Sequence, residues 1–420
     1  MRHIVYGIVV STTIVFALIV VLTQSAQAQT FKVIHTFTGK GDGATPWAGL
    51  TMDQAGNLYG TTCGNDCAYG GNAGTVFKLS RKGSGWIFNP LYNFVGGPDG
   101  ANPHAGVVFG PQGNLYGTTP YSDGHGCTNG SGCGKVFGLK PLASACESAF
   151  CQWAETVLYS FRGGSDGVAP ALGNVIFDSA GNLYGTTLFG GTYSAGMAFE
   201  LTSSGSGWTE THLYSFTGGS DGGYPYAGLI FDQAGNLYGT TSGGGAYGAG
   251  TVFELTPSGS GWTENTLYSF TGGGDGGYPY AGLLFDQAGV LYGATISGGQ
   301  AGGGTVFKLR PSNGAWTYSL VYSFKGPGGA YCGPTGDLVM DGAANLYGAT
   351  QCDGAQGEGS VFKLTPSGGS WTYSSLHDFA NGSDGGNPVG RLILDASGNL
   401  YGTASRADGK GQGVVFEITP

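Results

Sequence analysis

Short apolar runs recur along the chain, separated by runs of glycine, proline, asparagine, aspartate and serine. The clearest stretch reads LYSF at 213–216, LIFD at 229–232, NLYGTT at 236–241 and TVFELT at 251–256. Each apolar run is short and rich in β-branched and aromatic residues, which predicts a strand, and the polar runs predict tight turns. Residues 29–420 show no helical period, so the pattern predicts an all-β protein.

The pattern is a tandem repeat with a period of about 54 residues. Its seven copies are marked by Leu-Tyr-Gly centred on Tyr59, Tyr116, Tyr184, Tyr238, Tyr292, Tyr347 and Tyr401. Four predicted antiparallel strands in each of seven copies are typical of a seven-bladed β-propeller. Runs such as LIFD are apolar at consecutive positions, which indicates an innermost strand buried on both faces.

The two ends of the repeat region complement each other. The last copy supplies three strands, RLILD, NLYGTA and VVFEIT, and the segment Phe31 to Phe37 aligns with the fourth strand, TLYSF, of the other copies. We therefore expect the N-terminal strand to join the C-terminal blade and close the ring, which removes free sheet edges. With strands named a to d from the axis outward, the d-to-a and b-to-c loops lie on one side, the loop face.

The N-terminus indicates export. Residues 1–28 combine an apolar run from Ile4 to Leu22 with small residues at Ala26 and Ala28, as in a signal peptide. An uncleaved membrane anchor is the alternative, because the run is long enough to span a bilayer. Residues 29–420 then form one propeller domain, expected to be secreted or extracytoplasmic, monomeric and without a membrane span. The formal net charge of -10 argues against a nucleic-acid partner.

The eight cysteines lie in variable loops, which in an exported protein favours disulfides over metal sites. We expect no metal site or cofactor there. The loop positions predict four local bridges: Cys63–Cys67, Cys127–Cys133, Cys146–Cys151 and Cys332–Cys352.

The unit LYSFTGGSDGGYPYAGLIFDQAGNLYGTTSGGGAYGAGTVFELTPSGSGW resembles the GloVer (Gloeo/Verruco) tandem repeat, a family of exported bacterial proteins. The strings LYGTT, GTVFEL and DGxxPxAGL carry the resemblance across residues 31–420. It implies extracytoplasmic location and repeat architecture, and it brings no established activity, substrate or catalytic residues.

Residues present in most copies are expected to serve the blade. One set is an aspartate in the d-to-a loop, for which turn formation is favoured and calcium binding is the alternative: Asp42, Asp99, Asp166, Asp221, Asp275 and Asp384. A second set is a tryptophan in strand d, for which outer packing is favoured over a sugar platform: Trp86, Trp153, Trp208, Trp262, Trp316 and Trp371.

Residues that break the repeat are better candidates for function. Three residues after the loop proline the copies read Gly49, Gly106, Asn174, Gly228, Gly282, Asp337 and Arg391. Asp337 and Arg391 thus replace glycine at the mouth of the axial channel. Arg406 and Lys410 lie in the b-to-c loop of the last blade, and Asp353 and Glu358 in that of the sixth. Inter-blade ion pairing is the structural alternative to a polar ligand site.

One residue after the same proline, aromatic side chains predominate. The copies read Trp47, His104, Ala171, Tyr226, Tyr280, Thr335 and Val389. Four flat rings on one rim favour glycan or protein contacts, and packing between loops is the alternative.

No catalytic motif is present, and the six histidines are scattered over different strands and loops. The sequence therefore favours a binding or scaffold module for a glycan or protein at the cell envelope. The alternatives are a carbohydrate-active enzyme, a glycosidase or lyase, that uses Asp337 or Asp353 at the channel mouth, and a purely structural envelope protein.

Overall fold

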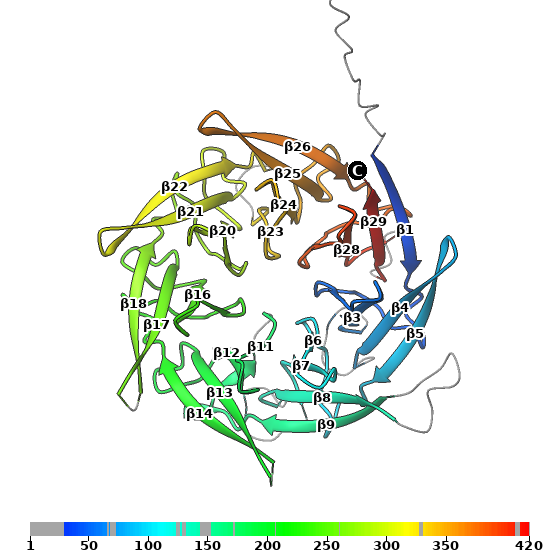
Figure 1. The fold of residues 1–420 in the computed structure, drawn as a ribbon, viewed down its shortest axis with the longest axis horizontal. Coiled ribbons are helices and arrows are strands. Elements are labelled where there is room, and N and C mark those ends of the chain that lie inside the picture. Colours follow the sequence, from blue (N-terminus) through cyan, green and yellow to red (C-terminus); the bar gives the residue numbers. More distant parts are fainter. Residues whose placement is uncertain are drawn as a thin grey trace, which may run out of the picture.

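The computed structural model describes residues 29–64, 67, 73–122, 127, 132–142, 153–170, 173–205, 207–259, 261–326, 331–407 and 412–419. These residues form seven antiparallel sheets arranged as blades around a central axis, so the predicted seven-bladed propeller is confirmed (Figure 1). The expected signal peptide, the pair Cys146 and Cys151, and Lys410 lie outside the described residues. No helix in the described part is long and apolar enough to cross a membrane.

Each blade follows the strand order predicted from the repeat. Blade 1 contains β2 (Thr51–Met52), β3 (Leu58–Thr62), β4 (Thr75–Lys82) and β5 (Gly85–Asn93). Blade 2 contains β6 (Val108–Phe109), β7 (Leu115–Thr119), β8 (Lys135–Pro141) and β9 (Trp153–Ser160). Blade 3 contains β11 (Ile176–Phe177), β12 (Leu183–Phe189), β13 (Met197–Ser204) and β14 (Gly207–Ser215), preceded by a 3-10 turn at Gly164–Asp166.

Blade 3 also has an additional short strand, β10 (Val168–Pro170), which pairs with the end of β12. In blade 4 the corresponding contact is a single bridge between Gly223 and Gly243. The contact joins a d-to-a loop to the end of strand b, and the b-to-c loop follows directly. Both kinds of loop therefore lie on the same face, as expected.

The remaining blades repeat the pattern. Blade 4 contains β15 (Ile230–Phe231), β16 (Leu237–Thr241), β17 (Thr251–Ser258) and β18 (Gly261–Ser269). Blade 5 contains β19 (Leu284–Phe285), β20 (Leu291–Thr295), β21 (Thr305–Ser312) and β22 (Ala315–Ser323). Blade 6 contains β23 (Val339–Met340), β24 (Leu346–Thr350), β25 (Ser360–Ser367) and β26 (Ser370–Asp378). Blade 7 contains β27 (Ile393–Leu394), β28 (Leu400–Ala404), β29 (Val414–Thr419) and β1 (Thr30–Thr36).

The ring closes through blade 7, where β1 lies outside β29 (Figure 1). Thr30 pairs with Thr419, and Thr36 pairs with Val414, so the two ends of the repeat region share one sheet. The predicted closure by the N-terminal strand is therefore present. Just beyond β1, Phe37 is 1% exposed and packs in the cluster that joins blade 7 to blade 1.

The core lies between neighbouring blades. In blade 4, all five residues of β16 are buried, because this strand has blades on both sides. Tyr238 of that strand meets two rings of blade 5 edge-on. Its ring centroid lies 5.1 Å from that of Phe285 and 6.2 Å from that of Trp316. Trp86, Trp208 and Trp371 make the corresponding contact in other blades, which supports the packing role of these tryptophans.

The innermost strands pack against the blades on both sides, as the sequence predicts, but their side chains are not fully buried. Each is only two residues long, and Ile230 and Phe231 of β15 are half-buried. In blades 5 to 7 the inner-strand side chains line an axial cavity of about 330 Å³, which includes Phe285, Met340 and Leu394. The apolar residues are continuous because successive side chains pack against opposite neighbours: Ile230 joins the apolar cluster between blades 4 and 5, and Phe231 joins the cluster between blades 3 and 4.

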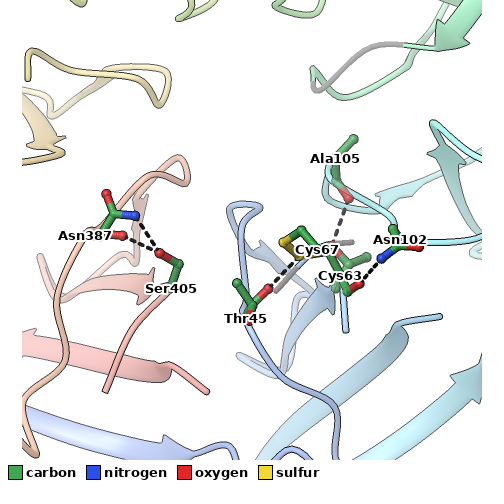
Figure 2. Close-up of a disulfide and its surroundings, with 8 residues drawn as sticks. Thr45, Cys63, Cys67, Asn102, Ala105, Asn387 and Ser405 are labelled. Atoms are coloured by element: carbon green, nitrogen blue, oxygen red, sulfur yellow. Dashed lines mark hydrogen bonds between the residues drawn. A yellow bond between two sulfur atoms is a disulfide. The ribbon is translucent and has the colours of Figure 1, made fainter. Parts of the chain in front are cut away.

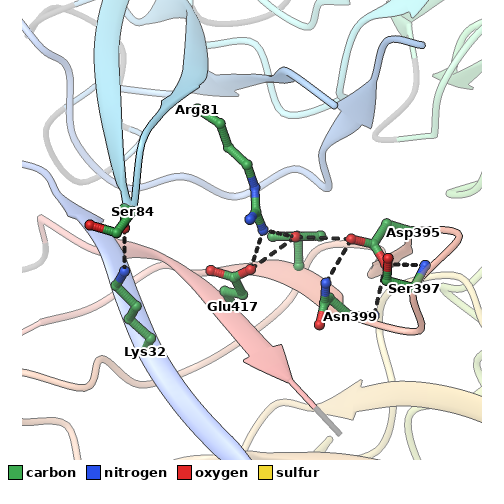
Figure 3. Close-up of polar contacts among 8 residues, drawn as sticks. Lys32, Arg81, Ser84, Asp395, Ser397, Asn399 and Glu417 are labelled. Atoms are coloured by element: carbon green, nitrogen blue, oxygen red, sulfur yellow. Dashed lines mark hydrogen bonds and ion pairs between the residues drawn. The ribbon is translucent and has the colours of Figure 1, made fainter. Parts of the chain in front are cut away.

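A polar clasp reinforces the junction between blades 7 and 1 (Figure 3). The guanidinium of Arg81 donates to the carboxylate of Glu417 and, at 2.5 Å, to the hydroxyl of Tyr401. The Tyr401 hydroxyl lies 2.9 Å from the Glu417 carboxylate and 3.1 Å from the Asp395 carboxylate, so its one proton is shared between two acceptors. The first and last repeats are thus joined by polar contacts as well as by strand pairing.

The repeated aspartates stabilise turns. In the a-to-b turn of blade 4, Asp232 accepts from the amides of Ala234 and Asn236, each at 2.8 Å. In the d-to-a loop, Asp221 accepts from the Thr217 amide at 2.8 Å and from the Tyr214 hydroxyl at 3.0 Å. Because these carboxylates already bond within their own loops, the contacts favour the turn role of the loop aspartates.

Three of the four expected disulfides lie in the described residues. Cys63–Cys67 and Cys127–Cys133 each close a short b-to-c loop, and Cys332–Cys352 joins the two loops of blade 6. The fourth expected pair is outside the described part of the chain.

Candidate functional site

A pocket of about 270 Å³ lies at the centre of the loop face, where the d-to-a loops converge. The aromatic rim residues expected from the sequence, Trp47, His104, Tyr226 and Tyr280, all line it. Asp337 and Arg391 line it as well. The pocket therefore gathers six predicted residues from six different blades, and no two of them are neighbours in sequence.

The rim contains two aromatic groups on opposite parts of the ring of blades. Tyr226 and Tyr280 stack with ring centroids 4.0 Å apart and planes 18° apart. Trp47 and His104 lie 6.2 Å apart and are tilted by 35°. Because each ring is only partly buried, the four side chains pack on one another and still present ring surface to the pocket.

The pocket floor is a ring of small residues that lie one and two positions after the rim residues in sequence, such as Ala48 and Gly49 after Trp47. Its backbones approach so closely that a Cβ on Gly49 would lie 2.8 Å from the Arg391 amide nitrogen. A Cβ on Gly173 would lie 1.6 Å from the Gly228 amide nitrogen. Glycine predominates here because neighbouring loops meet at the axis, so the repeated glycines are structural.

In most blades, a hydrogen bond from strand b holds this ring of small residues in place. The first threonine of the LYGTT string donates to the ring alanine of the next blade: Thr240 to Ala281 at 3.0 Å, and Thr403 to Ala48 at 2.8 Å. In blades 5 and 6 this threonine is replaced by alanine, Ala294 and Ala349. The two blades that lack this threonine directly precede the two blades in which the ring carries a charged residue, Asp337 or Arg391.

Asp337 and Arg391 do not pair with each other. The Asp337 carboxylate accepts a hydrogen bond from the amide of Gly282 in the preceding blade, at 2.6 Å. Arg391 is exposed and makes no ion pair among the described residues. The inter-blade ion pair that the sequence allowed is therefore absent from the described residues, and a backbone donor contacts the Asp337 carboxylate instead. Arg391 lines both the pocket and the axial cavity, so this residue lies where the two meet.

The remaining charged candidates lie elsewhere. Arg406 is exposed, and its backbone bridges to Gly386. Arg406, Asp353 and Glu358 are not among the residues that line the pocket in the described structure. Asp337 is the one carboxylate in that lining.

Apart from the small residues of the floor, three lining residues were not predicted: Ile296, Tyr331 and Gln351. Ile296 and Gln351 directly follow strand b, where the repeat has no constant residue, and Tyr331 lies in a loop that departs from the consensus. In the sequence, only their position in loops of the loop face could have indicated that they line the pocket.

Burial sets the charge of the rim. Desolvation lowers the pKa of His104 to about 4, and its Nε2 atom is buried without a hydrogen-bond partner. Desolvation raises the pKa of Tyr226 to about 12. Both rings are therefore neutral near pH 7, and Arg391 and Asp337 provide the formal charges of the pocket.

Aromatic side chains continue beyond the pocket over blades 3 to 6. Phe189 and Tyr224 meet edge-on at 5.8 Å, and Tyr278 and Tyr331 do so at 5.5 Å. Three of these side chains are exposed: 44% for Phe189, 40% for Tyr224 and 56% for Tyr331. The loop face thus offers ring surfaces both inside the pocket and beside it.

Comparison with known proteins supports the repeat assignment. The model of the Gloeobacter/Verrucomicrobia repeat matches twice, at residues 134–334 and 263–420. No curated protein matches the chain by sequence.

Solved structures show the same fold at low identity. The polysaccharide lyase Uly1 is 11% identical, with a TM-score of 0.51, over 92% of this chain and 99% of that chain. A fungal alcohol oxidase of the AA5 family, in complex with copper, is 12% identical, with a TM-score of 0.54, over 93% of this chain and 76% of that chain. At such identities the likeness shows the propeller fold alone.

Proposed function

The chain belongs to the Gloeobacter/Verrucomicrobia repeat family, and we propose that it is an extracytoplasmic binding module whose loop-face pocket holds a segment of an anionic glycan. The observation that carries this proposal is the convergence on a single pocket of partly exposed aromatic rings and of an arginine without an ion-pair partner among the described residues. The three disulfides fit an oxidising, extracytoplasmic compartment.

The aromatic rings supply the contact surface for the sugar. A sugar ring has an apolar face of C–H groups, and flat, rigid side chains bind such a face with little loss of conformational entropy. The stacked tyrosines are held in place by each other, and Trp47 is held beside His104. Rings that are fixed before the ligand arrives reduce the entropy cost of binding.

Arg391 supplies the charge preference. Its planar guanidinium can hold a carboxylate through two parallel hydrogen bonds, and no acidic side chain of the described residues pairs with it. Asp337 is already engaged by the Gly282 amide and therefore contributes an oriented acceptor for sugar hydroxyls. A uronic acid combines the required features: one carboxylate, several hydroxyls and an apolar ring face.

The pocket gives less support to a two-carboxylate hydrolase. Glycosidases of that kind need a second acid beside the first, and the described lining contains Asp337 alone. A glycan array of neutral and uronate-containing oligosaccharides tests the proposal, with reducing-sugar release measured on every positive glycan. We expect binding to uronate-containing glycans without product formation. Release of sugar ends would support the enzyme alternative, and an array without positive glycans would contradict the proposal.

A further inference from the structure

Two sulfur atoms and one imidazole lie together at the boundary between blades 1 and 2. The two sulfurs of Cys63 and Cys67 and a ring nitrogen of His104 all lie within 4.8 Å of one another. In the structure the cysteines form a disulfide, which Figure 2 shows with its surroundings. Within the described part of the chain, neither of the other two disulfides gathers a third potential metal ligand in this way.

The surrounding loops hold these residues in place. The Cys63 amide donates to the Thr45 carbonyl at 3.2 Å, and the Cys63 carbonyl accepts from the Asn102 side chain at 2.5 Å (Figure 2). Asn102 lies two residues before His104, so the same hydrogen bond that fixes Cys63 also fixes the loop that carries the imidazole. Cys63 itself is fully buried.

A second observation points to a ligand at this place. The Nε2 atom of His104 is buried and has no hydrogen-bond partner among the described residues. Buried polar atoms are nearly always paired in folded proteins, so an unpaired ring nitrogen calls for an explanation. An imidazole beside two sulfurs is a ligand set that thiophilic metals prefer.

We propose that Cys63, Cys67 and His104 form a redox-controlled zinc site, which binds Zn²⁺ when the disulfide is reduced. Two thiolates and one imidazole are three ligands of a tetrahedral ion, and the fourth position is left for water or a bound molecule. Zn–S distances of about 2.3 Å and Zn–N distances of about 2.0 Å require ligand atoms less than 5 Å apart, and the present spacing meets this limit.

The charge balance favours zinc over a monovalent soft metal. Two thiolates neutralise one Zn²⁺ ion, whereas the same ligands around Cu⁺ would leave a net negative charge in a buried place. Among the described residues, no ion pair places a cation next to Cys63 or His104, where it could compensate this negative charge.

The chemical change is a thiol–disulfide exchange followed by metal binding. An external dithiol supplies two electrons and two protons, so the Cys63–Cys67 bond breaks and the dithiol becomes a disulfide. Zn²⁺ then displaces the two thiol protons and accepts the lone pair of the neutral imidazole. Oxidation reverses the sequence and releases the ion. The oxidised protein therefore cannot bind zinc at this site, because the disulfide leaves no thiolate ligands.

The test uses the full chain, oxidised or reduced with a phosphine, with Zn²⁺ titrated against a chromophoric chelator. Co²⁺ is added in parallel, because thiolate-to-cobalt charge transfer reports sulfur ligation. The variants are C63S/C67S and His104→Gln, and C127S/C133S is the matched control because it removes another short loop bridge, at which the described residues gather no third metal ligand. Near-UV circular dichroism checks that each variant retains the folded ring.

The reduced protein is expected to bind one more Zn²⁺ ion than reduced C63S/C67S, and the oxidised protein should not bind that ion. His104→Gln keeps both cysteines, so this variant can fold with its disulfide formed before reduction. It should weaken zinc binding by about tenfold or more. C127S/C133S should retain the wild-type affinity at this site. Equal affinity of reduced wild type and His104→Gln, equal stoichiometry in C63S/C67S, or no zinc binding by the reduced protein would overturn the proposal.

Discussion

Tyr226 and Tyr280 stack face to face across the boundary between blades 4 and 5, with ring centroids 4.0 Å apart. They occupy equivalent positions in successive repeats, so the repeat itself brings the rings together. Both line the central pocket, which makes them part of the rim as well as of the contact between blades.

Replacement of Tyr280 by alanine should weaken glycan binding more than it affects stability. A central aromatic contact in an interface contributes about 2 kcal/mol or more to binding, whereas the lost stacking with Tyr226 costs about 0.5–1.5 kcal/mol of folding free energy. Calorimetric titration with a glycan selected on the array, and thermal unfolding, measure the two effects. Tyr247→Ala is the matched control, because Tyr247 is 67% exposed on the loop face and does not line the pocket.

Replacement of Phe37 by alanine should destabilise the closed ring. Phe37 is 1% exposed and packs against Phe77 of blade 1, with ring centroids 5.3 Å apart. Loss of a fully buried phenylalanine typically costs about 3–5 kcal/mol. Chemical denaturation of Phe37→Ala beside Val95→Ala, whose side chain is 76% exposed, measures this. Equal midpoints for the two variants would show that the junction between blades 7 and 1 contributes little.

Removal of the Cys332–Cys352 bridge should cost more stability than removal of Cys63–Cys67. The two bridges have sequence separations of 20 and 4 residues. In the chain-entropy model the longer loop contributes about 3 kcal/mol and the shorter one about 2 kcal/mol. Paired serine variants compared by denaturation give the difference, and a larger loss for the shorter loop would argue against this ranking.

Glu210 should make stability depend on pH near neutrality. Burial, with a smaller contribution from the charge of Asp166, raises the pKa of Glu210 to about 7, and its Oε1 atom has no hydrogen-bond partner. A carboxyl whose pKa is higher in the folded state favours folding when protonated, so its contribution is present at low pH and is lost as pH rises towards and through about 7. Glu210→Gln should therefore raise the melting temperature relative to wild type at pH 8, with a smaller difference at pH 5.

The control for this prediction is Glu358→Gln, which removes a carboxylate from a b-to-c loop of blade 6. It should not change the pH dependence of unfolding in the same way. If Glu210→Gln and wild type show the same pH profile, the raised pKa of Glu210 would be refuted.

The fold could be predicted from the sequence because it depends on local patterns repeated seven times. The turn at Asp232 and the alternation of strands are encoded within each unit, and the match of Phe31 to Phe37 with a missing fourth strand indicated the closure. The rim could be predicted for the same reason. Equivalent loop positions, such as those of Trp47 and Tyr280, must meet at the axis once the ring is closed.

Contacts that depend on the distance between loops could not be predicted. The sequence placed Asp337 and Arg391 in adjacent blades, but it did not reveal that the Asp337 carboxylate contacts the Gly282 amide, or that Arg391 has no ion-pair partner among the described residues. Similarly, Cys63 and His104 belong to different blades, and only the angle between those blades brings their side chains together. Such distances are set by packing across the blade boundary rather than by any local pattern.

The central claim is that the loop-face pocket binds an anionic glycan through Arg391. Arg391→Gly restores the residue that most repeats have here, and Arg391 has no ion-pair partner among the described residues, so the variant should unfold at the wild-type temperature. Arg406→Ala removes another exposed cation of the same blade, one that lies outside the pocket lining of the described residues. The two variants therefore separate a specific contact from the general effect of positive charge.

The most direct measurement is the calorimetric affinity of wild type, Arg391→Gly and Arg406→Ala for a uronate-containing oligosaccharide selected on the array. We predict a loss of about 1–2 kcal/mol for Arg391→Gly, because a charge-assisted hydrogen bond to the carboxylate disappears, and a change within about 0.5 kcal/mol for Arg406→Ala. Equal affinities for wild type and Arg391→Gly, or an equal loss in both variants, would contradict the assignment of the pocket as the binding site.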